Sequence, residues 1–310
     1  MKKESSNVIC IVVTYNRLSL LKEALAAIKA QTYPIRQILV IDNHSTDGTD
    51  KYLRSMKGDA QIRAVRMKSN TGGAGGFAEG IRLAAQERPD WIWMMDDDTI
   101  PTPDALERLM PATASDKVGF VCSKVVWTDG SLHLMNTPEI ADDQSAKDTV
   151  FDGQPEEKEN AVVVSQASFV SLLIRGDIPW RLGLPYKEFF IWCDDSEYTR
   201  RITDAGYCGL MAQRSVVLHK TGENYISSLA IVPAKAAWKV YYGERNESFL
   251  RRQRKGPWAF FFSQLNAFRT HKHRVCKRKL PKDEERALLK ASFRGLWDGF
   301  FFRPKVEYME

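Results

Sequence analysis

The sequence predicts an α/β fold in which a mostly parallel sheet is covered by helices on both of its faces. In the first hundred residues, apolar runs of strand length alternate with segments that carry apolar residues at helical spacing. A continuously apolar strand is buried on both faces, so helices must cover both sides of the sheet. From residue 238 onward the chain is expected to be helical, with breaks at 256–257 and 281, where Gly and Pro occur.

Each expected element follows from a local pattern. The run 8–13 is apolar throughout and has the length of a buried strand, whereas Leu21, Leu25 and Ile28 recur at the spacing of one helix face. By the same reasoning, strands are expected at 8–13, 38–41, 62–65, 91–95, 118–122 and 161–174, and helices at 18–30, 49–56 and 74–85. The acidic segment 139–160 contains Gly and Pro and is expected to be a mobile loop.

Composition narrows the class of protein. The chain has 310 residues and is 44% hydrophobic, which is enough for a large core. It contains no apolar run of the roughly 18 residues that a spanning helix needs and no secretory signal at its N-terminus, so a cytoplasmic location is expected. The five cysteines are scattered without a C-x-x-C pair, which indicates neither a zinc site nor a disulfide framework.

Polar clusters follow several expected strands, at the ends where parallel sheets bind their ligands. They lie at 14–17, 42–43 and 96–98. Asp96, Asp97 and Asp98 repel one another unless a cation sits among them, and Mg²⁺ or Mn²⁺ prefers carboxylate oxygens together with substrate phosphates. Side chains alternate along an extended segment, so Asp96 and Asp98 are expected to face one side and hold the metal. An acidic turn that only caps a helix is the alternative.

Two further segments and one histidine are candidates for chemistry. The glycine-rich segment 70–77 could bring backbone amides near a phosphate, although a tight strand-to-helix turn explains it equally well. It matches neither G-x-G-x-x-G nor the P-loop pattern, which argues against a dinucleotide oxidoreductase and a P-loop nucleotidase. Asp194 and Asp195 follow an aromatic run, where an apolar setting raises a carboxyl pKa toward that of a general base; a helix cap is the alternative. His219 either completes a metal site or is structural.

In this order the motifs resemble those of the family 2 glycosyltransferases. The matching elements are Val-Thr-Tyr-Asn-Arg at 13–17, Ile-Asp-Asn-His-Ser-Thr-Asp-Gly-Thr at 41–49, Asn-Thr-Gly-Gly-Ala-Gly-Gly at 70–76, Asp-Asp-Asp at 96–98, Trp-Cys-Asp-Asp-Ser-Glu-Tyr at 192–198 and His219. The resemblance implies the GT-A fold, a Rossmann-like nucleotide-sugar-binding domain with a mostly parallel mixed sheet. It also implies a nucleotide-sugar-binding half at 1–125, an acceptor-binding and catalytic half at 126–240, and a basic, aromatic helical region at 241–310.

The resemblance implies a role for each matching residue. The donor nucleotide would contact Thr14, Tyr15, Arg17, Asp42, Asn70, Gly72 and Asp97, the metal would be held by Asp96, Asp98 and His219, and the acceptor would contact Trp192 and Glu197. Asp195 would take a proton from the acceptor hydroxyl, with Asp194 orienting the acceptor. The oxygen would then attack the anomeric carbon in a single displacement that inverts it. Cys193 departs from the pattern, because the family branch usually has Trp directly before the Asp pair.

The donor sugar follows from finer details of the same motifs. The fully acidic triplet, the Trp-x-Asp-Asp motif and His219 resemble most the galactofuranosyltransferase branch, which sits close to the rhamnosyltransferases. UDP-galactofuranose is therefore the expected donor, and dTDP-rhamnose is the alternative. Addition of one sugar per acceptor is expected, because the chain is short for a long processive groove.

The C-terminal segment 249–303 mixes cations with aromatic residues. Between 249 and 280 there are ten Lys or Arg and no Asp or Glu. This pattern predicts a helix that binds an anionic membrane surface, with packing on the catalytic domain as the alternative. A peripheral location on the inner face of the cell membrane and a lipid-linked glycan acceptor would follow. An RNA-binding protein or an inactive scaffold would leave both acidic clusters unexplained, so no nucleic-acid partner is expected; the sequence leaves a homo-oligomer open.

Overall fold

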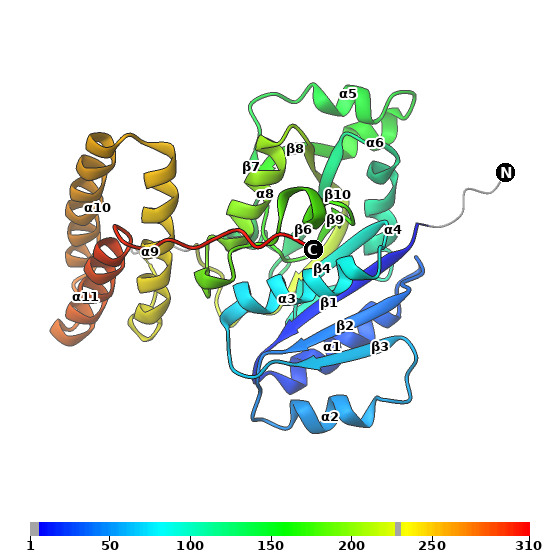
Figure 1. The fold of residues 1–310 in the computed structure, drawn as a ribbon, viewed down its shortest axis with the longest axis horizontal. Helices are drawn as coiled ribbons and strands as arrows, with labels where there is room; N and C mark the ends of the chain where they lie inside the picture. Colours follow the sequence, from blue (N-terminus) through cyan, green and yellow to red (C-terminus); the bar gives the residue numbers. More distant parts are fainter. Residues whose placement is uncertain (1–5, 227–230) are drawn as a thin grey trace. The chain divides into compact units, whose positions relative to one another are not determined.

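The structure is a computed structural model that describes residues 6–226 and 231–310 (Figure 1). The chain divides into two compact units. One, called the sheet unit here, comprises Met1–Lys187, Asp195–Asn224 and Val306–Glu310, and the other, the helical unit, comprises Glu188–Asp194 and Tyr225–Lys305. The predicted boundaries after residues 125 and 240 stay predictions.

The described part of the sheet unit contains a ten-stranded mixed sheet. Nine strands follow the order β3-β2-β1-β4-β9-β6-β10-β8-β7, and β5 pairs with β10. Parallel pairing joins β1 (Val8–Thr14), β2 (Gln37–Asp42), β3 (Ile62–Arg66) and β4 (Trp91–Asp96), and also joins β6 (Val118–Val126) to β10 (Cys208–His219). Antiparallel pairing adds β5 (Thr99–Pro101), β7 (Glu139–Ile140), β8 (Ala161–Gln166) and β9 (Leu172–Arg175). The predicted mixed sheet with covering helices is confirmed.

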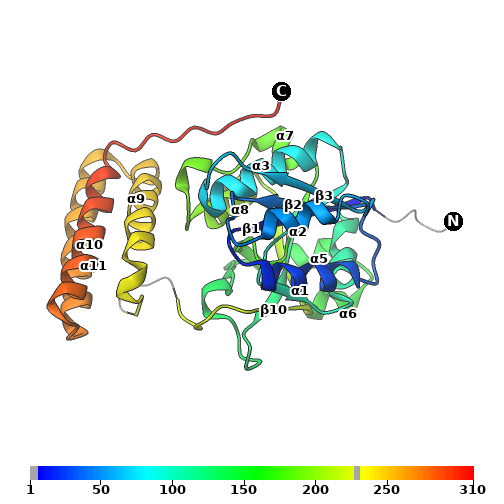
Figure 2. The ribbon, with the colours of Figure 1, turned by 90° about the horizontal axis from the view of Figure 1, so that it is seen from below.

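Helices cover both faces of this sheet because the central strands are apolar on both sides. In β1 every residue is buried, with Val8, Cys10 and Val12 in one core cluster and Ile9, Ile11 and Val13 in another. The first cluster includes α1 (Leu18–Lys29) and the second includes α3 (Gly72–Gln86). Figure 2 shows these two helices on opposite sides of the strands. The helix α2 (Thr49–Ser55) also forms where it was expected.

Part of the glycine pattern at the start of α3 serves packing against β1. A Cβ added at Gly76 would lie 2.6 Å from Val13 Cγ1, and one added at Gly80 would lie 2.6 Å from Ile11 Cγ2. These distances are too short for real carbon atoms, so only glycine allows α3 to lie this close to β1. The helix begins at Gly72, so the four glycines of the glycine-rich segment lie in its first turns.

Two predictions for the middle of the chain were wrong. The segment 161–174 forms two strands, because β8 pairs with β10 whereas β9 lies between β4 and β6. The segment 139–160 is not a loop but contains β7, α5 (Ala146–Val150) and α6 (Pro155–Asn160). Val150 and Phe151 anchor it in the core, an apolar contribution that its acidic composition hides. The other helices of the described residues are α4 (Ala105–Leu109), η1 (Met110–Ala114), η2 (Leu134–Asn136), α7 (Ile178–Leu182), η3 (Lys187–Phe189), α8 (Asp194–Asp204) and η4 (Ala234–Ala236).

The helical unit contains three longer helices that lie side by side (Figures 1 and 2). They are α9 (Ala237–Arg254), α10 (Pro257–Lys277) and α11 (Lys282–Asp298), separated at the predicted Gly-Pro and Pro breaks. Their small core includes Val232, Val240, Val275 and Leu288. Within the described residues, none of the helices combines the length and the apolar character needed to cross a bilayer.

A buried asparagine of α9 organises the segment that precedes the paired aspartates. Asn246 Nδ2 lies 3.0, 3.2 and 2.9 Å from the carbonyl oxygens of Phe189, Ile191 and Trp192. Trp192 and Cys193 have left-handed backbone angles, with φ of 65° and 68°. Such angles are costly for residues other than glycine, so the surrounding contacts must hold them.

Candidate metal and donor site

The predicted polar clusters meet at one edge of the sheet. Strand pairing places Thr14, at the end of β1, opposite Asp42 in β2, and Val13 opposite Asp96 in β4. The carboxyl ends of the three parallel strands therefore lie side by side, as expected for a ligand site in an α/β sheet.

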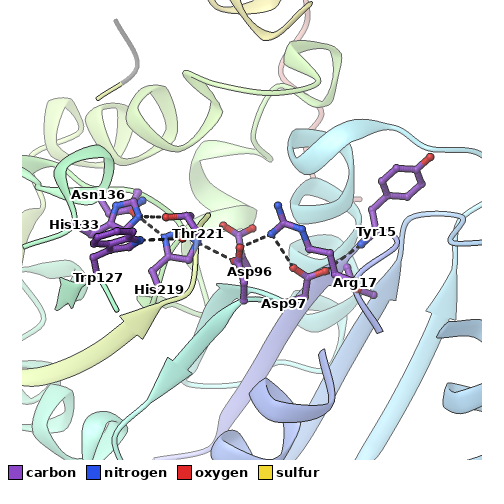
Figure 3. A network of polar contacts seen from close by, with 12 residues as sticks. Tyr15, Arg17, Asp96, Asp97, Trp127, His133, Asn136, His219 and Thr221 are labelled. Atoms are coloured by element: carbon purple, nitrogen blue, oxygen red, sulfur yellow. Dashed lines mark hydrogen bonds and ion pairs between the residues drawn. The ribbon is translucent and has the colours of Figure 1, made fainter. Parts of the chain in front are cut away.

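Asp96, Asp98 and His219 form a group that can hold a metal ion. One ligand atom from each residue lies within 4.8 Å of the others. Pairing between β5 and β10 sets Thr99 opposite His219 and so brings the end of the triplet to the end of β10. His219 Nε2 lies 2.8 Å from Asp98 Oδ1 and 3.9 Å from Asp96 Oδ2. Figure 3 shows the continuous set of contacts that runs through His219 and the aspartates.

The chemistry of this group fits a divalent cation. Burial raises the pKa of Asp98, but the hydrogen bond and charge of His219, together with the charge of Arg17, lower it to about 2. Asp98 is therefore ionised near neutral pH, and Asp96 is partly exposed beside it. Carboxylate oxygens and an imidazole nitrogen are donors that Mn²⁺ and Mg²⁺ accept, so these residues support a divalent metal without choosing between the two ions.

Asp97 contacts the end of β1 instead of the metal group. Its Oδ2 accepts a hydrogen bond of 2.7 Å from Thr14 Oγ1 and one of 3.3 Å from the Tyr15 amide. Arg17 pairs with both Asp97 and Asp98. Burial raises the pKa of Asp97 to about 7, although Arg17 and Thr14 oppose this shift. The alternation expected along the triplet therefore gives Asp97 different partners from its neighbours.

The other residues predicted to bind the donor lie around the same edge. Asp42 is buried, accepts a hydrogen bond of 2.8 Å from the Ser45 amide, and lies 3.4 Å from Arg66. Asn70 Oδ1 accepts a 2.8 Å bond from the Gly72 amide. The ring of Tyr15 is exposed.

Asn43 links two of these clusters, a role that the sequence does not reveal. Its Oδ1 accepts a hydrogen bond of 2.9 Å from the Thr71 amide, and its Nδ2 donates one of 2.7 Å to the Gly72 carbonyl. The end of β2 is thereby tied to the glycine-rich turn. Asn43 lies within a recognised motif, which is the one signal that could have identified it.

The second acidic cluster is divided between the two units. Asp195 and Glu197 belong to the sheet unit, whereas Trp192 and Asp194 belong to the helical unit. Burial raises the pKa of Asp195 to about 6; the Ser196 amide opposes this shift and the charge of Asp96 adds to it. A carboxylate with this pKa suits a general base near neutral pH.

Glu197 makes a different contact from the predicted one. Both of its carboxylate oxygens bind Arg201, at 3.0 Å from Nε and 2.5 Å from an Nη atom. Arg201 in turn donates to the carbonyl oxygens of Leu182 and Leu184, so this pair also anchors α8. Acceptor binding by Glu197 stays a prediction.

Four residues around His219 were not predicted. Asn136 and His133 contact the ring of His219. Thr221 contacts His133, and Trp127 contacts Thr221 (Figure 3). They come from the loop after β6 and the segment after β10. No spacing rule in the sequence connects these segments, because only the pairing of β6 with β10 brings them together.

Comparison with known proteins agrees with this geometry. The family model described as glycosyl transferase family 2 matches residues 9–170. Over 217 residues, the chain is 27% identical to galactofuranosyltransferase GlfT1 of Mycolicibacterium smegmatis, covering 65% of this chain and 67% of that protein. It is 36% identical over 97 residues to GlfT1 of Mycobacterium tuberculosis, covering 30% of this chain and 31% of that protein.

A solved structure shows the same fold. The mannosyltransferase PcManGT from Pyrobaculum calidifontis, in complex with GDP-Man and Mn²⁺, matches with a TM-score of 0.56 at 18% identity. The match covers 96% of this chain and 88% of that chain. The predicted GT-A fold class with a helical C-terminal region is thus confirmed.

Proposed function

Because the chain belongs to glycosyl transferase family 2, we propose that it transfers galactofuranose from UDP-galactofuranose to a hydroxyl group of a lipid-linked glycan. The observation that carries the proposal is the gathering of Asp96, Asp98 and His219 at the carboxyl edge of the sheet. Similarity to galactofuranosyltransferase GlfT1 supports the choice of sugar. One sugar is added per acceptor, with inversion of its anomeric centre.

The donor is bound at the carboxyl edge of the sheet unit. Asp96, Asp98 and His219 would hold Mn²⁺ or Mg²⁺, and a cation held there would supply positive charge beside the leaving diphosphate. Arg17, already placed between Asp97 and Asp98, adds a fixed positive charge at this edge. The other residues assigned to the nucleotide are Thr14, Tyr15, Asp42 and Asp97. Asn70 and Gly72 are assigned to the region of its diphosphate.

The acceptor is activated by Asp195. With a pKa of about 6, its carboxylate is mostly ionised at neutral pH and remains basic enough to take a proton. The proton of the acceptor hydroxyl moves to Asp195 as the oxygen forms a bond to the anomeric carbon and the bond to the diphosphate breaks. Asp194 orients the acceptor, and Trp192 and Glu197 contact it.

A donor panel tests this function. The protein with Mn²⁺ and a lipid-linked acceptor is incubated separately with UDP-galactofuranose, UDP-galactose, UDP-glucose and dTDP-rhamnose, and nucleoside diphosphate release is followed. We expect release from UDP-galactofuranose, reduced at least about a hundredfold in Asp96→Ala and Asp195→Ala. The exposed Asp152 provides the matched control, Asp152→Ala, which should retain full activity.

Three results would correct or contradict the proposal. Release from dTDP-rhamnose instead would replace the donor while keeping the family, and products longer by several sugars would contradict single addition. Turnover that survives in Asp96→Ala would contradict the metal site itself.

We also propose that the protein binds an anionic membrane surface at the inner face of the cell membrane, and the helical unit supports this proposal. Trp258 and Phe262 of α10, and Trp297 and Phe301 in and after α11, have exposed fractions of 77%, 63%, 56% and 69%. A groove on the same two helices is lined by Phe268, Lys282, Glu285, Arg286, Leu289, Lys290 and Phe293. Exposed aromatic side chains beside basic ones suit the boundary between lipid headgroups and acyl chains.

Not all of the basic residues in this region are available to lipid. Arg252 donates to the carbonyl oxygens of Gly299, Phe300 and Phe302, and Arg278 donates to that of Val232. The cations that remain exposed between 249 and 280 are Arg254, Lys255, Arg269, Lys272, Arg274, Lys277 and Lys279. Each of these, if near the surface, contributes on the order of 1 kcal/mol to binding.

Vesicle sedimentation tests the membrane proposal. We expect the protein to bind vesicles that contain phosphatidylglycerol and not those of phosphatidylcholine alone. The double variant Trp258→Ala/Phe262→Ala should lose this binding, whereas Tyr308→Ala, which removes an exposed aromatic ring of the sheet unit, should retain it. If the protein instead bound single-stranded RNA and did not bind the vesicles, the proposal would be contradicted.

A further inference from the structure

We propose that Asn136 is a positioning residue that fixes the tautomer of His219, so that the Nε2 lone pair faces the metal group. The inference rests on the metal site proposed above. It concerns a residue that is not one of the three proposed ligands and belongs to no motif of the sequence.

The sheet brings Asn136 to His219 from a distant part of the chain. Val126, the last residue of β6, lies opposite Leu218 in the parallel strand β10. The loop after β6 therefore lies beside His219, the last residue of β10. Asn136 is buried in this loop, and its Oδ1 lies 2.8 Å from His219 Nδ1.

The amide of Asn136 turns its oxygen toward the ring of His219 and its nitrogen toward Ser168. Asn136 Nδ2 donates a hydrogen bond of 3.0 Å to Ser168 Oγ. An amide oxygen only accepts hydrogen bonds, so His219 Nδ1 must carry the proton of the neutral ring.

This tautomer makes the other ring nitrogen a ligand. His219 Nε2 lies 2.8 Å from Asp98 Oδ1, where a charged ring donates a hydrogen bond to the carboxylate. A cation at this site would take the place of the Nε2 proton, while the Nδ1 proton would keep its hydrogen bond to Asn136. The Asn136 contact therefore leaves Nε2 as the nitrogen that is open to a cation, in the way that a hydrogen bond on the far nitrogen orients metal-binding histidines generally.

The surrounding loop limits rotation of the imidazole. The rings of His133 and His219 lie with centroids 4.7 Å apart. His133 Nε2 lies 2.8 Å from Thr221 Oγ1, and Trp127 Nε1 donates a hydrogen bond of 2.9 Å to the Thr221 carbonyl. Figure 3 shows Asn136, His133 and Trp127 gathered on one side of His219, with Asp96 on the other.

Binding of Mn²⁺ to the full chain, measured from the electron paramagnetic resonance signal of the free ion, tests the inference without any substrate. We expect Asn136→Leu to weaken Mn²⁺ binding by roughly ten- to a hundredfold at fixed pH. Asn136→Asp retains an acceptor toward Nδ1 and should bind Mn²⁺ at least as tightly as the wild type.

Asn224→Leu is the matched control. Asn224 also ties the loop after β6 to the segment after β10, through the Leu132 carbonyl and the Leu134 amide, but has no hydrogen bond to His219. Its substitution should lower the melting temperature without changing the affinity for Mn²⁺, and melting curves of all variants report their folding.

The outcomes distinguish failure of the Asn136 proposal from failure of the metal site. Unchanged or tighter Mn²⁺ binding by Asn136→Leu, or equal weakening in Asn136→Asp and Asn224→Leu, would overturn the role of Asn136 while leaving the metal site intact. A wild-type chain that binds no Mn²⁺ would overturn the metal site and this inference with it.

Discussion

Three consecutive aspartates of one short segment meet three different environments. Asp96 is partly exposed, Asp97 is bound to Thr14 and the Tyr15 amide, and Asp98 is buried against His219. Alternation of side chains along the segment predicts the separation of Asp97 from its neighbours. The identity of its partner does not follow from the sequence, because Thr14 lies 83 residues away and meets Asp97 only through the pairing of β1 with β4.

The pH dependence of turnover tests the role of Asp195 at this scale. Its pKa is raised to about 6, and only the deprotonated carboxylate can accept a proton from the acceptor. At subsaturating acceptor, kcat/KM should therefore be level above about pH 6 and fall about tenfold for each pH unit below it. The Asp152→Ala variant should give the same profile, whereas activity that stays level down to pH 4.5 would remove Asp195 as the base.

The residues around His219 could not be predicted from the sequence. The residues proposed to bind the metal could be named because their spacing and order match a family motif. Asn136 could not, because it lies 83 residues from His219 in a loop with no motif, and only the pairing of β6 with β10 joins them.

At the scale of elements, the contact between α3 and β1 explains part of the glycine-rich segment. A Cβ at Gly76 would meet the branched and buried side chain of Val13, whereas one at Gly73 has no atom within 4 Å. We expect Gly76→Ala to lower the free energy of unfolding by about 1 to 3 kcal/mol through overpacking. Gly73→Ala should raise it by less than about 1 kcal/mol, since Ala favours helix more than Gly does.

Urea unfolding of both glycine variants measures these changes. Equal effects of Gly73→Ala and Gly76→Ala would mean that the glycines serve the turn or a ligand, and not the contact between α3 and β1.

The contact of α9 with the segment before Asp194 makes a second prediction for an element. Asn246 is fully buried, and its Nδ2 lies near three backbone carbonyl oxygens. Asn246→Leu leaves these acceptors unsatisfied, so we expect it to lower the free energy of unfolding by about 1 to 3 kcal/mol. Asn266→Leu, on the exposed surface of α10, is the control and should change stability little. Identical urea midpoints for the two variants would contradict this role of Asn246.

Prediction of elements succeeded where the apolar pattern was long and regular. The buried runs of β1, β2 and β4 and the apolar face of α1 are visible in the sequence, because burial on both faces or on one stripe dictates their composition. The segment 161–174 appears as one apolar run, yet its two halves pair with different strands. The pairing partners of a strand depend on the whole sheet, so they cannot be predicted from the apolar pattern of the strand itself.

At the scale of the whole molecule, the site is a product of strand order. The sheet gathers residues from Thr14 to His219, and the order of the motifs along the chain was sufficient to predict the family and fold. Family membership fixes neither the donor sugar nor the acceptor, and the solved mannosyltransferase PcManGT of the same fold contains GDP-Man. Self-association into a homo-oligomer stays a prediction.

The measurement that tests the central claim most directly is donor turnover after metal removal. The protein is treated with EDTA, the chelator is removed, and UDP release from UDP-galactofuranose in the presence of acceptor is followed as Mn²⁺ or Mg²⁺ is added back. We expect no turnover without metal, recovery of turnover when metal is added back to the wild type, and no recovery when the same metal is added to Asp98→Asn. Turnover that persists in EDTA, or that Asp98→Asn supports equally well, would contradict a metal-dependent transferase built on Asp96, Asp98 and His219.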